Sequence, residues 1–132
     1  MFKKLTILLF FHLFVIYPAF SMEKETTFNK ELFNKAQSDG KIVVVSSWIK
    51  YCSSCASQMK VLNKAKNEGK LLDINFKNIE YFSFDVTNKE IANLLNVKFQ
   101  TTLLIYKDNK EIYRSLGETT EDLIYEALKK VI

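Results

Sequence analysis

The chain of 132 residues has few of the residues that bind metals, terminate helices or loosen loops. It contains one histidine, one proline, three glycines and two cysteines. The histidine and the proline, His12 and Pro18, both lie among the first 21 residues. There is no repeat, no low-complexity tract and no linker rich in proline or serine, so the remainder is expected to form one domain. With 48% apolar and 14% aromatic residues, that domain can bury a core without disulfide staples.

Motifs for nucleotide binding and hydrolysis are also missing. The sequence has no G-x-x-x-x-G-K-[ST] loop, no G-x-S-x-G elbow and no recognisable motif of paired carboxylates. Beyond residue 21, 17 basic residues stand against 15 acidic ones, and the two kinds are interspersed. This pattern is typical of a solvated surface, so no nucleic-acid partner is expected.

The first 21 residues have the pattern of a secretory signal. Lys3 and Lys4 precede an apolar stretch over residues 5–17, and Ala19 and Ser21 place small residues at the minus-three and minus-one positions of a cleavage site. Both lysines are expected to stay in the cytoplasm while the rest of the chain crosses the membrane. The pattern therefore predicts export to the periplasm.

Cleavage of this segment divides the chain into a signal peptide over residues 1–21 and a mature domain over residues 22–132. An uncleaved membrane anchor that leaves the domain facing the periplasm is the alternative. As a helix, the apolar residues 5–20 span about 24 Å, which is shorter than the roughly 30 Å hydrocarbon core of a bilayer. The length therefore favours cleavage.

Both cysteines lie in the stretch Trp48–Cys55, with the sequence WIKYCSSC, between the apolar run Ile42–Val45 and residues with helical spacing. Two thiols three residues apart at the start of a helix lie on one face and can close into a disulfide. Such a bridge closes a very small loop and adds little chain-entropy stabilisation. A helix N-terminus also favours the thiolate of Cys52, so the pair is suited to thiol-disulfide exchange.

Apolar periodicity and turn residues predict eight elements in the order α-β-α-β-α-β-β-α. They are a helix from Thr27 to before Gly40, a strand over Lys41–Ser47, a helix from the cysteines to Gly69, a strand over Ile79–Val86, a helix opened by a capping box at Thr87–Glu90, strands over Thr102–Tyr106 and Glu111–Ser115 joined by a turn at 107–110, and a helix after a cap at Thr119–Asp122. Residues 70–78 are ambiguous. The helix after the capping box is expected to turn Ile91, Leu94 and Leu95 inward, and the last helix to carry Leu123 on its buried face. The order implies an α/β fold with a mixed central sheet flanked by helices.

This order, together with Trp48-x-x-x-Cys52-x-x-Cys55 between a buried strand and a helix, resembles the thioredoxin superfamily. Within this superfamily, the chain is most similar to the C-terminal thioredoxin-like domain of bacterial disulfide-interchange reductases. The similarity lies in residues Asp85–Asn88, Leu94–Val97 and Thr102–Tyr106. The resemblance covers about residues 28–131 and implies a thioredoxin-like three-layer sandwich. It also implies that Cys52 is the partly exposed nucleophile, that Cys55 is the buried resolving cysteine, and that Trp48 packs beneath the active site.

Two positions depart from the family's pattern. Family members usually have a cis-proline facing the cysteines, where this sequence has Thr101. A cis bond before a non-proline residue costs about 2.5 to 4 kcal/mol, so the loop is expected either to store that strain or to be trans. Ser46 stands where thioredoxins often carry a buried carboxylate that helps to deprotonate the resolving cysteine. A serine hydroxyl is a poor base near neutral pH, so the step at Cys55 is expected to be slow unless another group assists.

Four further residues belong to the candidate site by position. Lys50 can favour the Cys52 thiolate by proximity, although a lysine beside Tyr51 in a loop is more often solvated. Ser53 and Ser54 can donate hydrogen bonds to the thiolate, or can simply favour the first turn of a helix.

The expected function is therefore an exported thiol-disulfide oxidoreductase without a cofactor, acting through a mixed disulfide on protein thiols or disulfides, with a membrane-bound redox partner. One alternative is a thiolate metal site, in which Thr101 leaves room for Cu(I) or for a cluster bridged by the cysteines of two chains. Two thiolates and no histidine cannot complete a tetrahedral zinc site within one mature chain. Covalent haem is unsupported because Ala56 stands where the C-x-x-C-H motif needs histidine. The third reading is a non-catalytic thioredoxin-like binding module.

Overall fold

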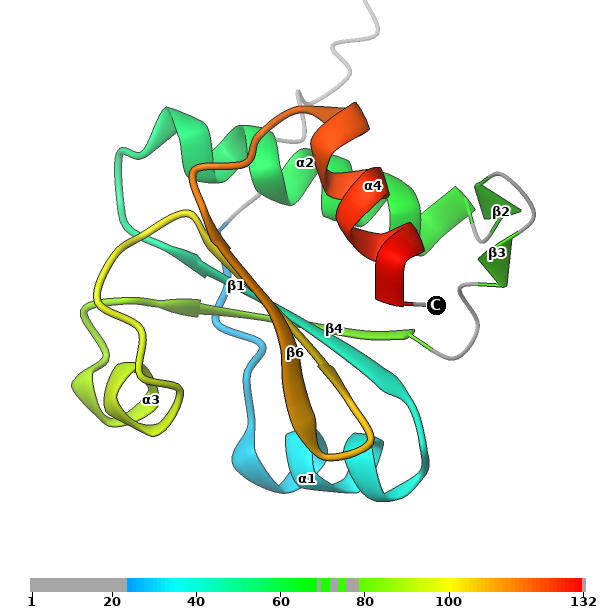
Figure 1. Ribbon diagram of the computed structural model, residues 1–132. Coiled ribbons are helices and arrows are strands. Elements are labelled where there is room, and N and C mark those ends of the chain that lie inside the picture. The colour runs from blue at the N-terminus through cyan, green and yellow to red at the C-terminus, as the bar shows by residue number, and fades with distance from the viewer. Residues whose placement is uncertain (1–23, 69, 72–73, 76–78, 132) are drawn as a thin grey trace, which may run out of the picture.

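A four-stranded mixed sheet forms the centre of the computed structural model, which describes residues 24–68, 70–71, 74–75 and 79–131 (Figure 1). The strands, in spatial order, are β4 (Ile79–Asp85), β1 (Ile42–Trp48), β5 (Thr102–Lys107) and β6 (Lys110–Leu116). Strand β1 is parallel to β4 and antiparallel to β5, which pairs antiparallel with β6. The predicted mixed sheet and the predicted order of the main elements are confirmed.

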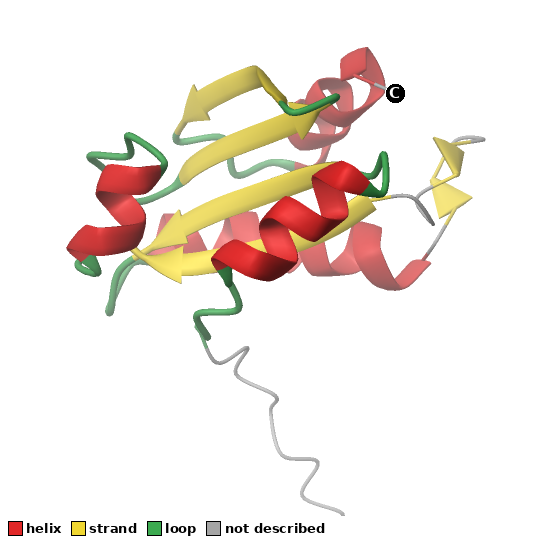
Figure 2. Ribbon diagram, turned by 90° about the horizontal axis from the view of Figure 1, so that it is seen from below, coloured by secondary structure: helices red, strands yellow, loops and turns green. Residues whose placement is uncertain are grey.

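Helices cover both faces of the sheet and make three layers (Figure 2). Helices α1 (Lys30–Ser38) and α3 (Lys89–Leu94) pack on one face, and α2 (Ser53–Glu68) and α4 (Glu121–Val131) pack on the other. Strand β1 serves both cores because alternate residues of a strand point to opposite faces. Val43 and Val45 join the first core and Val44 the second, and all three are fully buried. Burial of each such side chain stabilises the fold by about 1.5–3 kcal/mol, which explains the unbroken valine run.

The chain that precedes α1 lies along the outer edge of β4. The amides of Thr27 and Phe28 donate to the oxygen of Ser83, and the amide of Asp85 donates to the hydroxyl of Thr26. Phe28 is buried and its ring meets that of Phe33 at a centroid distance of 5.3 Å. These contacts cover an otherwise open strand edge and direct residue 24 toward the C-terminal end of β1.

The hairpin turn between β5 and β6 is confirmed. Asp108 and Asn109 have φ angles of 52° and 59°, as a two-residue turn whose twist matches that of the strands requires. The ambiguous segment contains two short antiparallel strands, β2 (Lys70–Leu71) and β3 (Ile74–Asn75).

The start of α3 differs from the predicted capping box by one residue. Asn88, rather than Thr87, is the N-cap, and its side chain accepts from the amide of Ile91 at 3.3 Å. The amide and hydroxyl of Thr87 bond to the carboxylate of Asp85 instead. The carboxylate thus holds Thr87 in the turn before the helix.

Two leucines predicted to be buried are exposed. In α3 the buried face is the one that carries Ala92. Leu94 is two residues further along the helix, so it lies on the opposite face and is 47% exposed. In α4 the buried stripe starts at Ile124, which leaves Leu123 on its flank and 48% exposed. The apolar periodicity placed both helices correctly but misjudged these two side chains.

Within the described part of the chain, no helix combines the length and the apolar character needed to cross a bilayer. The predicted signal peptide, residues 1–21, lies outside the described residues.

Candidate active site

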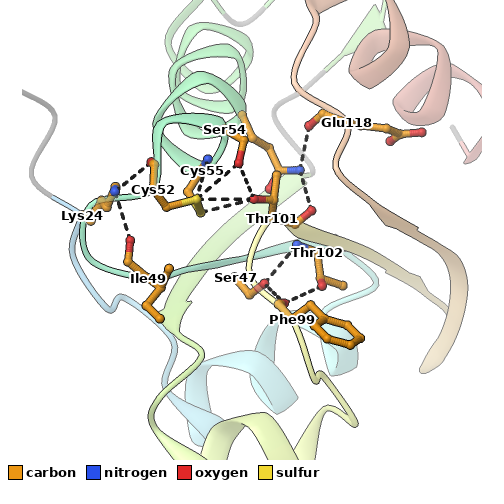
Figure 3. Close-up of a disulfide and its surroundings, with 11 residues drawn as sticks. Lys24, Ser47, Ile49, Cys52, Ser54, Cys55, Phe99, Thr101, Thr102 and Glu118 are labelled. Atoms are coloured by element: carbon orange, nitrogen blue, oxygen red, sulfur yellow. Dashed lines mark hydrogen bonds between the residues drawn. A yellow bond between two sulfur atoms is a disulfide. The ribbon is translucent and has the colours of Figure 1, made fainter.

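The two cysteines lie where the central strand β1 runs into helix α2, and they form a disulfide with a Cα–Cα distance of 5.3 Å (Figure 3). Cys52 directly precedes the helix and is half-buried, whereas Cys55, in the first turn, is fully buried. The amide of Cys55 donates to Cys52 Sγ at 3.1 Å. A helix N-terminus directed at this sulfur stabilises negative charge on it, so Cys52 is the sulfur suited to react as a thiolate.

Lys50 and Tyr51 project from the loop before Cys52. Tyr51 has a φ angle of 63° and is 90% exposed, and Lys50 Nζ lies 4.9 Å from the centre of its ring. The ammonium group of Lys50 is thus directed to an aromatic ring rather than to a sulfur.

The positive charge that does reach the Cys52 backbone is that of Lys24. Its Nζ donates to the oxygen of Ile49 at 3.0 Å and to the oxygen of Cys52 at 2.9 Å, and so bridges both ends of the loop (Figure 3). Sequence reasoning missed Lys24 because nothing local connects it with a motif 28 residues away.

Thr101 faces the disulfide from the turn before β5. Its Oγ1 lies 3.2 Å from Cys55 Sγ and 3.6 Å from Cys52 Sγ, within hydrogen-bonding distance of both (Figure 3). It also lies 3.0 Å from Ser54 Oγ, which is itself 3.3 Å from Cys52 Sγ. Two neighbouring hydroxyls thus contact the disulfide, one from the first turn of α2 and one from the turn before β5. Ser53, the first residue of α2, is exposed.

From the sequence, the peptide bond before Thr101 is expected to be either a strained cis bond or a trans bond, because this position lacks the usual cis-proline. No peptide bond among the described residues is cis, and Thr101 has a φ angle of 59°. A β-branched residue rarely adopts this left-handed conformation, whose cost is of order 1–3 kcal/mol. The conformation is held by hydrogen bonds from the Thr101 amide to Ser47 O at 2.8 Å and from the Gly117 amide to Thr101 O at 2.9 Å.

Two buried polar side chains that sequence reasoning missed also hold this turn. Gln58, fully buried on α2, donates from Nε2 to the oxygens of Thr101 and Glu118 at 3.3 and 2.9 Å. Ser47 donates from Oγ to the oxygen of Phe99 at 2.8 Å and accepts from the amide of Thr102 at 3.0 Å. A glutamine three residues after Cys55, on the buried stripe of a helix, was the available sequence signal.

Trp48 and Ser46 both lie on β1. Trp48 lines a hollow of about 440 Å³ together with Lys24 and Asp85, and its indole Nε1 is buried without a hydrogen-bond partner among the described residues. Ser46 is 3% exposed and lines a separate cavity of about 180 Å³ that also contacts Met59. The structure therefore puts a hydroxyl, not a carboxylate, at the Ser46 position.

Among the residues that the structure describes, no three His, Cys, Asp or Glu side chains are grouped closely enough to hold a metal ion. A tetrahedral zinc or a cluster held by Cys52 and Cys55 would therefore need ligands from outside the described residues, such as a second chain.

A disulfide at the start of a helix, after the central strand of a mixed three-layer sheet and opposite the turn before an antiparallel strand, defines the site of a thiol-disulfide oxidoreductase. The family model described as Thioredoxin matches residues 20–130. The chain belongs to the thioredoxin family, and its Cys52–Cys55 pair makes it a protein disulfide oxidoreductase.

Two thioredoxins are similar to the chain in sequence, and solved structures have the same fold. The chain is 26% identical over 96 residues to thioredoxin H-type of Fagopyrum esculentum, covering 72% of this chain and 77% of that protein. It is 26% identical over 90 residues to a thioredoxin of Coprinus comatus, covering 67% and 80%. Among solved structures, Trxlp from Edwardsiella tarda superposes with a TM-score of 0.66 at 24% identity, over 76% of this chain and 94% of that one. Fasciola hepatica thioredoxin gives a TM-score of 0.58 at 25% identity, over 76% and 88%.

Proposed function

We propose that this protein is an exported thiol-disulfide oxidoreductase in which Cys52 exchanges with the substrate and Cys55 resolves the mixed disulfide. The difference in exposure between the two cysteines carries the proposal. Cys52 is half-buried at the molecular surface and has the helix amide directed at it, whereas Cys55 is 0% exposed. A protein substrate can therefore approach Cys52 but not Cys55.

The cycle runs through one mixed disulfide. In the reducing direction, the Cys52 thiolate attacks a substrate disulfide and releases the first substrate thiol. The Cys55 thiolate then attacks Cys52 Sγ and displaces the second substrate thiol. Two electrons pass to the substrate, and the protein is left with the Cys52–Cys55 disulfide seen in the structure. In the oxidising direction, a substrate thiol attacks that disulfide at Cys52 and the steps run in reverse.

Members of this family act on protein thiols and disulfides. The finer proposal is that the substrates are exported proteins and that a membrane-bound redox partner returns the cysteine pair to its working state. The basic and apolar pattern of residues 1–21 supports export. An exported protein is separated from cytosolic reductants, so a partner in the membrane is the simplest route for electrons.

An equilibrium redox titration in glutathione buffers tests the activity. Trp48 fluorescence and free thiols are followed together, and bound metal is assayed on the same sample. We expect a reversible two-electron transition in metal-free protein. Thiols that stay unreactive while stoichiometric metal is retained would instead support the metal-binding alternative.

Substitution tests the two roles. Cys52→Ser is expected to abolish disulfide exchange with insulin, whereas Cys55→Ser keeps the first attack and accumulates a mixed disulfide at Cys52. Retention of exchange in Cys52→Ser would refute the proposed enzyme mechanism. For export, the N-terminal residue of protein recovered from the periplasm is sequenced, and Met22 is expected.

A further inference from the structure

We propose that the hydroxyls of Thr101 and Ser54 form a relay that carries the Cys55 proton to solvent during resolution of the mixed disulfide. The inference rests on the proposed function, in which Cys55 is the resolving cysteine. It begins from the contact of 3.2 Å between Thr101 Oγ1 and Cys55 Sγ and the contact of 3.0 Å between Thr101 Oγ1 and Ser54 Oγ (Figure 3).

Resolution requires a thiolate at a site that disfavours one. Cys55 is fully buried, and burial penalises the charged form of a thiol. Related proteins often have a buried carboxylate that helps to deprotonate the resolving cysteine, but this chain has Ser46 at that position. The proton must therefore leave by another route.

The two hydroxyls span the distance from the buried sulfur to water. Thr101 is 4% exposed and cannot pass a proton to solvent by itself, whereas Ser54 is exposed in the first turn of α2. Ser54 Oγ is also 3.3 Å from Cys52 Sγ, so the outer hydroxyl lies beside the sulfur that Cys55 attacks. The two steps between protein atoms, from Cys55 to Thr101 and from Thr101 to Ser54, are both within hydrogen-bonding distance.

The charged groups around the relay have other partners in the described structure. The ammonium of Lys24 bonds to the backbone oxygens of Ile49 and Cys52. The main-chain oxygen of Glu118 accepts a hydrogen bond from Gln58, and the Glu118 carboxylate accepts hydrogen bonds from the hydroxyls of Tyr113 and Ser115. The Thr101 hydroxyl, and not a charged base, is thus the side-chain group that contacts the Cys55 sulfur in the described structure.

The resolving step then balances as follows. The Cys55 thiol gives its proton to Thr101 Oγ1, Thr101 passes its own proton to Ser54 Oγ, and Ser54 passes its proton to water. The electron pair on Cys55 Sγ forms the bond to Cys52 Sγ while the bond from Cys52 Sγ to the substrate sulfur breaks. The substrate leaves as a thiolate and takes a proton from solvent. After the transfer, the Thr101 hydroxyl can donate to the Cys55 thiolate and stabilise it.

The backbone keeps Thr101 in place for this role. Its left-handed φ of 59° is maintained by hydrogen bonds that involve Ser47, Gly117 and Gln58. Together they hold Oγ1 within hydrogen-bonding distance of both sulfurs, as expected of a preorganised site.

A stopped-flow reaction of the reduced protein with one equivalent of 5,5′-dithiobis(2-nitrobenzoate) separates the two steps. The first thionitrobenzoate released reports attack by Cys52, and the second reports resolution by Cys55. Thr101→Val removes the hydroxyl at nearly constant shape, and we expect the second phase to slow about ten- to a hundredfold, as on losing a hydrogen bond to a charged group. Thr101→Ser retains the hydroxyl and is expected to restore most of the rate.

Ser54→Ala tests the outer hydroxyl at an exposed position where folding is not at risk. We expect this substitution to slow the second phase more than the first. In the wild-type protein, replacing H2O by D2O is likewise expected to slow the second phase more than the first. A second phase that is unchanged in both Thr101→Val and Ser54→Ala, or slowed equally by Thr101→Val and Thr101→Ser, would overturn the relay. Wild-type protein that releases only one thionitrobenzoate would instead overturn the proposed function.

Discussion

Gln58 Nε2 donates to the main-chain oxygen of Thr101 at 3.3 Å and so joins the helix that carries Cys55 to the turn that faces it. The same nitrogen donates to Glu118 O at 2.9 Å, in the segment after β6. One buried amide thus connects three parts of the chain around the disulfide. Its Oε1 has no hydrogen-bond partner among the described residues.

Gln58→Leu is expected to destabilise the protein by about 1–3 kcal/mol, because one buried and one partly buried carbonyl lose a donor. The substitution also removes the buried Oε1 that has no hydrogen-bond partner, and this gain offsets part of the lost stability. The free energy of unfolding is measured by urea denaturation of the oxidised protein, and resolution by the second thionitrobenzoate phase, which should slow as the Thr101 turn loosens. Gln37→Leu is a matched control, since Gln37 is also buried with an unpartnered Oε1 but lies on α1. Equal effects of the two substitutions on the second phase would contradict the role given to Gln58.

Lys24→Met is expected to slow alkylation of reduced Cys52 by iodoacetamide at pH 7 about two- to fivefold. The ammonium bonds to Cys52 O at 2.9 Å, and removal of a nearby positive charge disfavours the thiolate. Lys24→Arg keeps the charge and should react nearly as the wild type does. Because the side chain is only half-buried, the difference should narrow as salt is raised toward 1 M.

Lys50→Met is the control for Lys24, and it also tests the expectation from sequence that Lys50 assists Cys52. Lys50 is exposed, with its ammonium over the ring of Tyr51, so we expect alkylation to change by less than about twofold, as for a screened surface charge. A larger effect for Lys50→Met than for Lys24→Met would reverse the assignment made from the structure.

The Arg114 guanidinium holds the pKa of Glu111 below its usual range through a hydrogen bond of 2.6 Å. A carboxyl whose pKa is lowered by folding contributes stability above its unfolded pKa, and that stability is lost as the pH falls through the folded pKa. Glu111→Gln should therefore lower the free energy of unfolding at pH 7, by at most about 1 kcal/mol because the pair is largely exposed. The difference from the wild type in urea denaturation should shrink toward pH 3. A constant difference from pH 7 to pH 3 would show that the ion pair is not its source.

The elements of this fold were predictable where their signals are local. The valines of β1, the helical spacing after Cys55 and the polar turn at Asp108 each act within a few residues. The contacts that shape the site are not local: Gln58 meets Thr101 across 43 residues and Thr102 meets Ser47 across 55. The position of Thr101 opposite the cysteines followed from the family resemblance. Its left-handed backbone and the contact of its hydroxyl with both sulfurs depend on packing that no short pattern encodes.

Ser46→Asp tests whether a buried carboxyl can replace the hydroxyl relay. Ser46 is 3% exposed, so burial should raise the pKa of the introduced carboxyl. A carboxyl whose pKa is raised by folding leaves stability unchanged below its unfolded pKa and destabilises the protein increasingly as the pH rises toward the folded pKa. We therefore expect Ser46→Asp to be less stable than Ser46→Asn at pH 8 and similar to it at pH 4, in urea denaturation.

In the Thr101→Val background, the same substitution should recover part of the second thionitrobenzoate phase, because a carboxylate at this position can accept the Cys55 proton. Recovery should require the ionised form, so the rate should rise with pH through the pKa of the introduced carboxyl. Ser46→Asn in the same background offers no base and should recover nothing. Equal recovery by both variants would mean that the step depends on the packing around Cys55 and not on removal of its proton.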